Sequence, residues 1–242
     1  MKNNLRYIFS GMKGVLKYEG IISLISRGYV FLLHRFFMFD EYYAIFMKTH
    51  RVPEDIEIDF LPKTDDFCLK IITSNKEADK LVSDGFVLGA YELNLRASLD
   101  KGVVSFCLFV GREFAHVSCL ADNSRGKKTI DPRPLKVDYQ NGEVVVGRAL
   151  TVPKFRRLGL QTYNGYVLRK YCRDININRV ISSVNAHNIP ALASNPKAAE
   201  RYVTSKYRFI KALWFTHIKE TKMEPTTTNQ IVAQMTGIKK NH

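Results

Sequence analysis

Two kinds of hydrophobic pattern divide the chain. In residues 1–50 apolar side chains recur at helical spacing, first in residues 5–16, which carry basic side chains on the opposite side, and again in residues 21–36. From Phe67 onward, short apolar runs separated by turn residues predict strands with helices between them. The pattern therefore predicts an N-terminal helical extension followed by an α/β domain.

The second part of the chain alternates predicted strands with predicted helices. The expected strands are residues 67–73, 102–110, 113–120, 135–139, 143–152, 180–184 and 202–218, and the expected helices are residues 75–84, 160–175 and 189–198. Asn75 is the expected cap of the first helix. The turn residues Gly111-Arg112 and Gln140-Asn141-Gly142 predict hairpins, and residues 124–134 predict a turn-rich basic loop.

These segments give the chain three parts. An amphipathic helical extension and its linker take residues 1–55, the α/β domain takes residues 56–220, and a polar C-terminal tail takes residues 221–242. Two prolines and six acidic residues between positions 51 and 66 indicate the linker. We expect the tail to be frayed.

The apolar stripes of residues 1–50 need a partner surface. Their aromatic and basic composition is typical of a helix that lies at a membrane interface, and packing on the domain or on a second subunit satisfies the same pattern. Membrane contact and dimer contact both stay open. No run reaches 18 uncharged apolar residues, and we identify no secretory signal. The expectation is a cytoplasmic protein, with peripheral attachment at the inner membrane face as the open alternative.

Composition and charge narrow the class of partner. Hydrophobic residues at 45% and charged residues at 25% are ordinary globular values and exclude a disordered chain. The four cysteines show no C-x-x-C spacing, so we expect free thiols and no metal. Residues 123–242 carry 22 Lys/Arg against 7 Asp/Glu, whereas residues 51–122 carry 8 against 13. The C-terminal half should therefore bind an anionic partner, such as a phosphorylated cofactor, nucleic acid or an anionic membrane.

The densest chemical signal lies where the strand 143–152 gives way to the helix 160–175. The chain there reads Leu150-Thr151-Val152-Pro153-Lys154-Phe155-Arg156-Arg157-Leu158-Gly159-Leu160-Gln161-Thr162. The first amides of a helix have no intrahelical acceptor and lie at the positive end of its dipole, so they bind phosphate. Gly159 allows a close approach of a ligand to the backbone, and Arg156 and Arg157 add charge. This turn predicts a pyrophosphate site.

The turn resembles the R/Q-x-x-G-x-G/A motif of the GCN5-related N-acetyltransferase (GNAT) superfamily. Residues 184–198 resemble that family's next element, in which a strand leads to an asparagine that caps a helix, here Asn188. The order of strands in residues 67–218 also fits. The resemblance implies a GNAT-like mixed central sheet flanked by helices, an α/β fold, for the domain. Gln161 stands at the family's second glycine position and Arg157 at a common glycine, so both depart from the pattern.

What the resemblance implies is transfer of an acetyl group from acetyl-CoA, as co-substrate, to an amine. The amides from Leu158 to Thr162 would hold the pyrophosphate, backbone groups of Leu150 and Val152 would pair with the pantetheine arm, and a backbone amide near Leu150 would polarise the thioester carbonyl. The residues assigned to acetyl-CoA are thus Leu150, Val152, Arg156, Arg157, Leu158, Gly159, Leu160, Gln161, Thr162 and Asn188.

Three residues are candidates for moving protons. His116 and Glu143 could act as the general base on the amine, and Tyr202 could return a proton to the leaving thiolate. No cysteine or serine lies beside an evident base, so we expect direct attack of the amine without an acyl-enzyme. The acceptor stays open among an amino sugar of a surface glycan, a small amine and a peptide N-terminus.

Two other functions fit the sequence. One is a non-catalytic basic module that binds nucleic acid or an anionic membrane. The other is a GNAT-like fold that binds CoA without catalysis. Nucleic-acid binders mix basic and aromatic residues over one face, whereas the arginines here cluster at a strand-to-helix turn, which favours a compact phosphate ligand over nucleic acid.

Overall fold

A computed structural model of the protein describes residues 37–49, 57–193 and 201–237. The chain divides into two compact units, one made of Met1–Glu41 and Tyr207–Thr221 and the other of Tyr42–Lys206 and Lys222–His242. The predicted helical stripes of residues 1–36 lie outside the described residues, as does most of the predicted linker.

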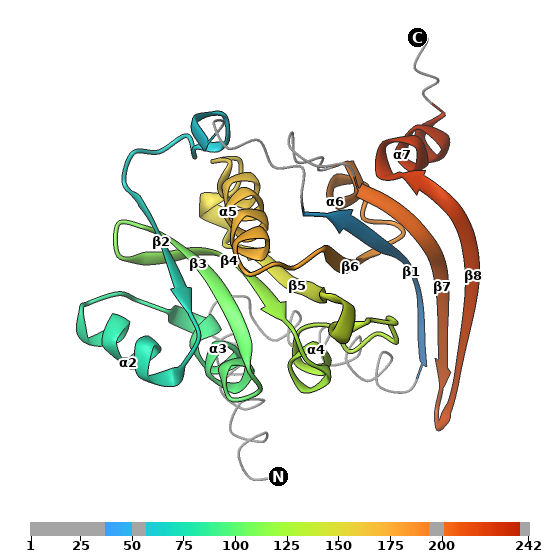
Figure 1. Cartoon of the computed structure of the whole chain (residues 1–242), viewed down its shortest axis with the longest axis horizontal. Helices are drawn as coiled ribbons and strands as arrows, with labels where there is room; N and C mark the ends of the chain where they lie inside the picture. Colours follow the sequence, from blue (N-terminus) through green and yellow to red (C-terminus); the bar gives the residue numbers. More distant parts are fainter. Residues whose placement is uncertain (1–36, 50–56, 194–200, 238–242) are drawn as a thin grey trace, which may run out of the picture. The chain divides into compact units, whose positions relative to one another are not determined.

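A mixed sheet forms the framework. Among the described residues it has eight strands in the order β2-β3-β4-β5-β6-β1-β7-β8 (Figure 1). Their bounds are β1 Phe37–Lys48, β2 Phe67–Ile72, β3 Val103–Val110, β4 Glu113–Ala121, β5 Glu143–Thr151, β6 Arg179–Asn185, β7 Arg201–Ala212 and β8 Phe215–Thr227. Neighbours from β2 to β5 are antiparallel, β5 and β6 pair in parallel, and β1 pairs antiparallel with β6. The predicted mixed central sheet is confirmed.

Helices cover both faces of the sheet in the larger unit. The helices are α2 Asn75–Ser83, α3 Glu92–Leu99, α4 Ser124–Ile130, α5 Leu160–Asp174, α6 Ile189–Ala193 and α7 Thr228–Thr236, and the 3-10 turns are η1 Glu57–Phe60, η2 Gly89–Tyr91, η3 Tyr139–Asn141 and η4 Pro153–Phe155. Leu99 and Ile130, from α3 and α4, pack with Val145 of β5, whereas Leu168 of α5 packs with Val144. Because successive strand side chains point to opposite faces, α5 and the pair α3–α4 lie on opposite sides.

Strand β1 corrects the prediction of a helical extension up to residue 50. Residues Tyr42 to Lys48 pair with Asn185 to Arg179 of β6, and Tyr42 and Ile45 are buried. The segment is rich in aromatic side chains, which suit a pleated surface. Its pairing with β6 therefore determines its conformation.

Two segments predicted to be irregular are helical. In place of the basic loop, α4 begins after Asn123, whose side chain accepts a 2.8 Å hydrogen bond from the Gly126 amide. In place of the frayed tail, β8 continues to Thr227 and α7 follows it. Thr227 and Gln230 form a capping box, and Ile231 is buried in a hydrophobic cluster with Ile45. Capping and tertiary packing stabilise both helices.

The predicted hairpin at residues 135–152 is also wrong. Residues 135–139 contain no strand, and the side chain of Asp138 caps the 3-10 turn η3 by accepting a hydrogen bond from the Asn141 amide. Gly142 has a left-handed conformation with φ 73°. The Asn-Gly pair therefore ends a 3-10 turn before β5.

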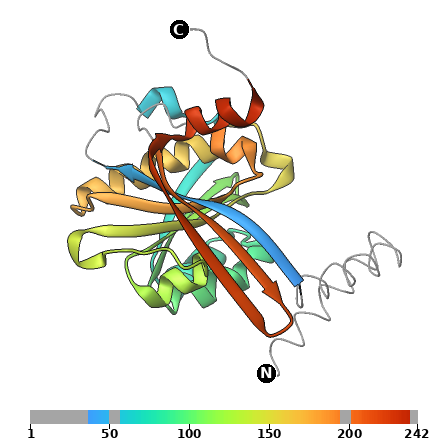
Figure 2. The same ribbon diagram turned by 90° about the vertical axis from the view of Figure 1, so that its right-hand side faces the viewer.

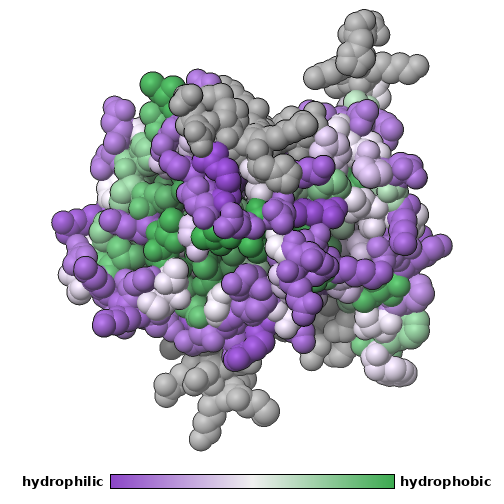
Figure 3. Space-filling model, viewed as in Figure 1, coloured by the Kyte–Doolittle hydropathy of each residue, from purple (hydrophilic) through white to green (hydrophobic). Residues whose placement is uncertain are grey.

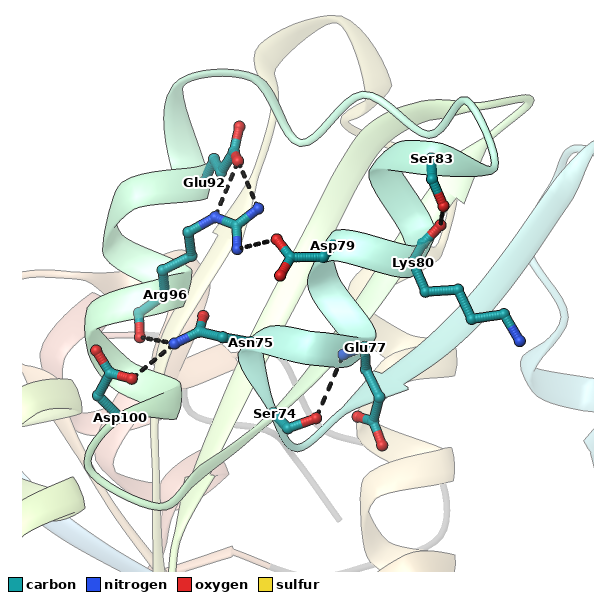
Figure 4. A network of polar contacts seen from close by, with 9 residues as sticks. All are labelled: Ser74, Asn75, Glu77, Asp79, Lys80, Ser83, Glu92, Arg96 and Asp100. Carbon is teal, nitrogen blue, oxygen red and sulfur yellow. Dashed lines mark hydrogen bonds and ion pairs between the residues drawn. The ribbon is translucent and has the colours of Figure 1, made fainter.

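Helices α2 and α3 are joined by polar contacts (Figure 4). Arg96 Nη1 lies 2.7 Å from Asp79 Oδ1, and Arg96 Nε donates to Glu92 Oε1 at 2.9 Å. Asn75 Nδ2 donates to Asp100 Oδ1 at 2.6 Å, and the actual cap of α2 is Ser74 rather than Asn75. Such exposed pairs stabilise by roughly 0.2–1 kcal/mol each, so they orient the two helices more than they stabilise them.

Candidate functional site

The parallel neighbours β5 and β6 pair over three residues only. The pairs are Glu143 with Arg179, Val144 with Val180 and Val145 with Ile181. Beyond them β5 continues to Thr151 beside β4, and β6 continues beside β1. The two strands therefore separate toward their carboxyl ends, the place where open α/β sheets bind ligands.

A bulge in β5 bends the strand just before this end. Leu150 lies opposite Val117, but Gly147 lies opposite Cys119, so β5 has an extra residue there. Arg148 has a φ of 50°, a left-handed conformation that is strained for a side chain of this size. Its guanidinium donates to Ser98 Oγ of α3 at 3.1 Å, which anchors the bulge. Bulges of this kind re-aim the residues that follow.

A pocket of about 470 Å³ opens between the end of β5 and the start of α5. Its walls are Ala149, Leu150, Thr151, Arg156, Arg157, Gly159, Leu160, Gln161 and Thr162. Seven of these nine residues are predicted from the sequence to bind acetyl-CoA. Ala149 and Thr151 are the additions. The volume lies within the ordinary range for small-molecule sites.

The start of α5 presents free backbone donors to this pocket. Gly159 is the N-cap, with φ 80° and no side-chain hydrogen bond. The amides of Thr162 and Tyr163 both donate to the carbonyl of Gly159 at 3.0 Å. The amides of Leu160 and Gln161 precede these bonds in the helix, where amides have no intrahelical acceptor. They are available to an anion at the positive end of the helix dipole.

Two arginines add full charges to the same turn. Arg156 and Arg157 are exposed, and neither forms an ion pair with a carboxylate of the described residues. Arg157 has a φ of 68°. Behind the turn, the Lys63 amide donates to the Leu158 carbonyl at 2.8 Å, and Leu158 packs against the buried cluster of Phe60 and Tyr166. The turn is thus held from behind, and its arginines face solvent.

His116 reaches the pocket through a hydroxyl. It lies opposite Thr151 in the β4–β5 register and is fully buried. Its Nδ1 is 2.7 Å from Thr151 Oγ1, and its Nε2 is 3.3 Å from Ser118 Oγ. Burial lowers the pKa of His116 to about 4, so the imidazole is neutral near pH 7. A neutral imidazole both donates and accepts hydrogen bonds, and it meets the pocket only through Thr151.

The structure does not bring the other proton-transfer candidates to this pocket. Glu143 is the first residue of β5, bound to Arg179 at 3.1 Å. Glu143 is the first residue of the nine-residue strand and Thr151 the last, so the two lie at opposite ends of β5. The ring of Tyr202 in β7 stacks on Phe46, 5.2 Å between centroids, and does not line the pocket.

Three residues assigned to acetyl-CoA also lie outside the pocket walls. Asn188 caps α6, as predicted, because its Oδ1 accepts from the Ala191 amide at 3.2 Å. The Val152 amide donates to the Ala115 carbonyl at 2.9 Å, and the Leu158 carbonyl accepts from Lys63. The pocket itself therefore rests on Leu150 and the turn that ends at Thr162.

Neither a cluster of three potential metal ligands nor a membrane-spanning helix occurs in the part of the chain that the structure describes. Among those residues, no three His, Cys, Asp or Glu side chains lie close enough together to bind a metal ion. Within the same ranges, no helix combines the length and the apolar character that crossing a membrane requires.

Comparison with solved structures identifies similar folds. The chain is similar to a GCN5-related N-acetyltransferase-like protein from Streptococcus suis, with 16% identity, a TM-score of 0.44, and coverage of 77% of this chain and 66% of that one. It is similar to a GCN5-related N-acetyltransferase from Sphaerobacter thermophilus, with 11% identity, a TM-score of 0.44, and coverage of 90% and 70%.

A third similar structure is a GCN5-related glucosamine N-acetyltransferase region in a fungal multi-domain β-N-acetylglucosaminidase. The identity is 8% and the TM-score 0.48, and the match covers 79% of this chain but only 23% of that one. No protein-family profile matches the sequence, and no curated protein does. These three structural neighbours are GCN5-related N-acetyltransferases or are named as similar to them, all at low sequence identity.

Proposed function

We propose that the protein is an acetyl-CoA-dependent N-acetyltransferase that moves the acetyl group directly to an amine. One observation carries the proposal. A pocket at the point where two parallel strands separate is bounded by the start of α5, which has no side-chain cap, and by Arg156 and Arg157, which form no ion pair within the described residues. Free amides, a helix dipole and guanidinium groups together select a diphosphate.

Different residues of the pocket wall would bind different parts of acetyl-CoA. The amides of Leu160 and Gln161, with Arg156 and Arg157, would bind the pyrophosphate. Ala149 to Thr151 would line the path of the pantetheine arm along the freed end of β5, where β6 no longer pairs. A backbone amide past the bulge would donate to the thioester oxygen as negative charge develops on it.

The acyl transfer needs only the amine and the thioester. The amine nitrogen forms a bond to the carbonyl carbon, the carbon–sulfur bond breaks, and the proton that the amine loses ends on the leaving thiolate, which departs as free CoA thiol. Of the three proton-transfer candidates, only His116 lies within hydrogen-bond reach of a pocket residue. We assign His116 a positioning role. It orients the Thr151 hydroxyl, which is the group that would contact the reacting amine or thiolate.

Thiol chemistry supports direct attack. Burial raises the pKa of Cys68, Cys107, Cys119 and Cys172, in the last case to about 12. None of the four lines the pocket. A thiol with a raised pKa is a poor nucleophile, so an acetylated cysteine is not expected on the path.

The test is release of free CoA thiol from acetyl-CoA across a library of amines that includes amino sugars. We expect release with at least one amine and a mass increase of one acetyl group on that amine. A rise in melting temperature with acetyl-CoA, but no thiol release with any amine, would instead identify a protein that binds CoA without catalysis. No rise at all would refute the assignment of the pocket.

A further inference from the structure

The hairpin of β7 and β8 ends in an exposed hydrophobic tip. Two residues, Leu213 and Trp214, connect Ala212 to Phe215 (Figure 2). Trp214 is 90% exposed, Phe215 56%, Leu213 44% and Ile218 41%. In the space-filling view, hydrophobic residues reach the surface toward this end of the hairpin, at the lower right, among mostly hydrophilic ones (Figure 3). Contiguous exposed apolar side chains are uncommon on monomeric soluble proteins, and larger patches of this kind mark interaction sites.

The turn holds these side chains at a cost in backbone strain. Leu213 has a φ of 55°. Two-residue hairpin turns require such a conformation, and glycine, asparagine and aspartate are the residues that adopt it without strain. A bulky leucine in this position is an outlier, and outliers of this kind concentrate at functional sites. The residue choice therefore favours exposure of leucine and tryptophan over turn stability.

Positive charge flanks the tip. The segment from Arg201 to Thr227 holds six Lys/Arg and two Glu. Lys219 and Lys222 are exposed, and neither forms an ion pair within the described residues. Arg208 pairs with Glu41 at 2.9 Å, so the six Lys/Arg of the segment still outnumber the acidic groups, which are its two glutamates and Glu41. The tip thus has an apolar end and cationic sides.

We propose that the β7–β8 tip inserts into the interface of an anionic lipid bilayer. Tryptophan and phenylalanine are enriched at the headgroup level of membranes, where an apolar body and a polar edge are both satisfied. Lys219, four residues beyond Phe215, attracts anionic headgroups, and such attraction falls off over about 10 Å. The tip is convex, so it fits a deformable surface rather than filling a groove. The charge complementarity selects anionic over neutral lipid.

The chain offers a direct reporter, because Trp214 is its only tryptophan. Full-length protein is titrated with vesicles of phosphatidylcholine containing phosphatidylglycerol, and with phosphatidylcholine alone. We expect the Trp214 emission to shift to shorter wavelength and to be quenched by brominated acyl chains with the anionic vesicles, and to change little with the neutral ones. Salt should weaken the response.

Matched variants separate the two contributions while keeping the reporter. Phe215→Ser removes apolar area and Lys219→Glu reverses a charge, and each should weaken binding to anionic vesicles about tenfold. Leu93→Ser alters a similarly exposed side chain, 51% exposed, on α3 and should leave binding unchanged. The melting-temperature rise with acetyl-CoA should persist in all three variants, so failure here is distinguishable from failure of the proposed function.

Two results would overturn the proposal. The first is sedimentation of the protein with anionic vesicles while Trp214 emission stays that of a water-exposed indole, which would place the membrane contact outside the hairpin. The second is a blue shift that grows with protein concentration in the absence of lipid, with a matching rise in mass by light scattering. That result would show a second copy of the chain covering the tip.

Discussion

The turn before α5 and the tip of the β7–β8 hairpin both hold a non-glycine residue at positive φ, but they expose different groups to solvent. At the start of α5, Arg157 and Gly159 have φ values of 68° and 80°, and the chain folds around a pocket that exposes backbone amides. At the β7–β8 tip, Leu213 has a φ of 55° and the chain exposes side chains. Similar backbone strain thus accompanies a pocket beside backbone amides in one turn and an exposed apolar tip in the other.

What stands behind each turn explains the difference. The α5 turn is held by the Lys63–Leu158 hydrogen bond and by a buried cluster that includes Leu160. The tip residues from Leu213 to Ile218 are all exposed. A supported turn can fix donors at the positions a rigid ligand requires. An exposed tip without such packing presents apolar side chains rather than fixed hydrogen-bond donors, which suits a partner that adapts its shape.

Replacing Gly159 tests the first half of the comparison and should have the largest effect. In Gly159→Val, a β-branched side chain would have to adopt φ 80°, a strained conformation for it, so the turn that carries the free amides has to rearrange. We expect the melting-temperature rise with acetyl-CoA to disappear. Gly237→Val is the control, because Gly237 has a φ of 68° and open space around it but caps α7 instead. An equal loss in the control would mean that strain alone abolishes binding.

Substitution of Thr151 tests whether the contact between His116 and the Thr151 hydroxyl takes part in the chemistry. Thr151→Val keeps the shape of the side chain and removes the hydroxyl that meets His116. We expect a fall of about a hundredfold in kcat with a small change in KM, the usual size of a lost proton-transfer group. Ser118→Ala removes the other hydroxyl partner of His116 and should leave kcat nearly unchanged. An equal fall in kcat in both variants would show that His116 has only a structural role.

The buried state of His116 also predicts how stability depends on pH. The unfolded chain binds a proton at the ordinary pKa of 6.5, but the folded protein does so only near pH 4, because burial disfavours the charged ring. As the pH falls, the unfolded state therefore gains the proton first and folding becomes less favourable. The free energy of unfolding from denaturant titration should drop by about 2 kcal/mol from His116 between pH 7 and pH 5.

The histidine responsible can be identified by substitution. His116→Gln should remove most of this drop, whereas His187→Gln, at the turn before α6, should retain it. A drop that survives in His116→Gln would assign the effect to other groups.

The smallest effect concerns the strained tip. Leu213→Asn places a residue that tolerates positive φ in the turn, so the free energy of unfolding should rise by roughly 0.5–1 kcal/mol. Phe215→Asn, in the strand beside it, should show no such gain. Both should bind anionic vesicles more weakly than the original chain. An unchanged stability in Leu213→Asn would show that the turn holds no usable strain.

Much of the candidate site could be predicted because it is local in sequence. The apolar run up to Thr151, the proline that follows it, Gly159 and the helical periodicity after it lie within one stretch of chain, and each acts on its own neighbours. Helix α5 begins and ends within one residue of the prediction, and Asn188 caps the next helix as expected. Capping and periodicity depend on residues three or four positions apart, so sequence reveals them.

The proton-transfer residues could not be predicted in the same way. His116 and Glu143 are equally plausible in a list of titratable residues, but one lies opposite Thr151 and the other at the far end of β5. The β4–β5 register includes a bulge at Arg148, and a shift of one residue would have pointed His116 to the other face. No local signal specifies which bulge forms.

The sequence by itself thus determined the strand-to-helix turn, the charges it carries and the α/β class, because backbone conformation there depends on near neighbours. Tertiary structure alone decided that residues 37–48 join the sheet as β1, that residues 124–130 form α4, and that Thr151 meets a buried His116. Short segments with weak periodicity take the conformation that buries their apolar side chains best. That outcome depends on contacts between residues far apart in the chain.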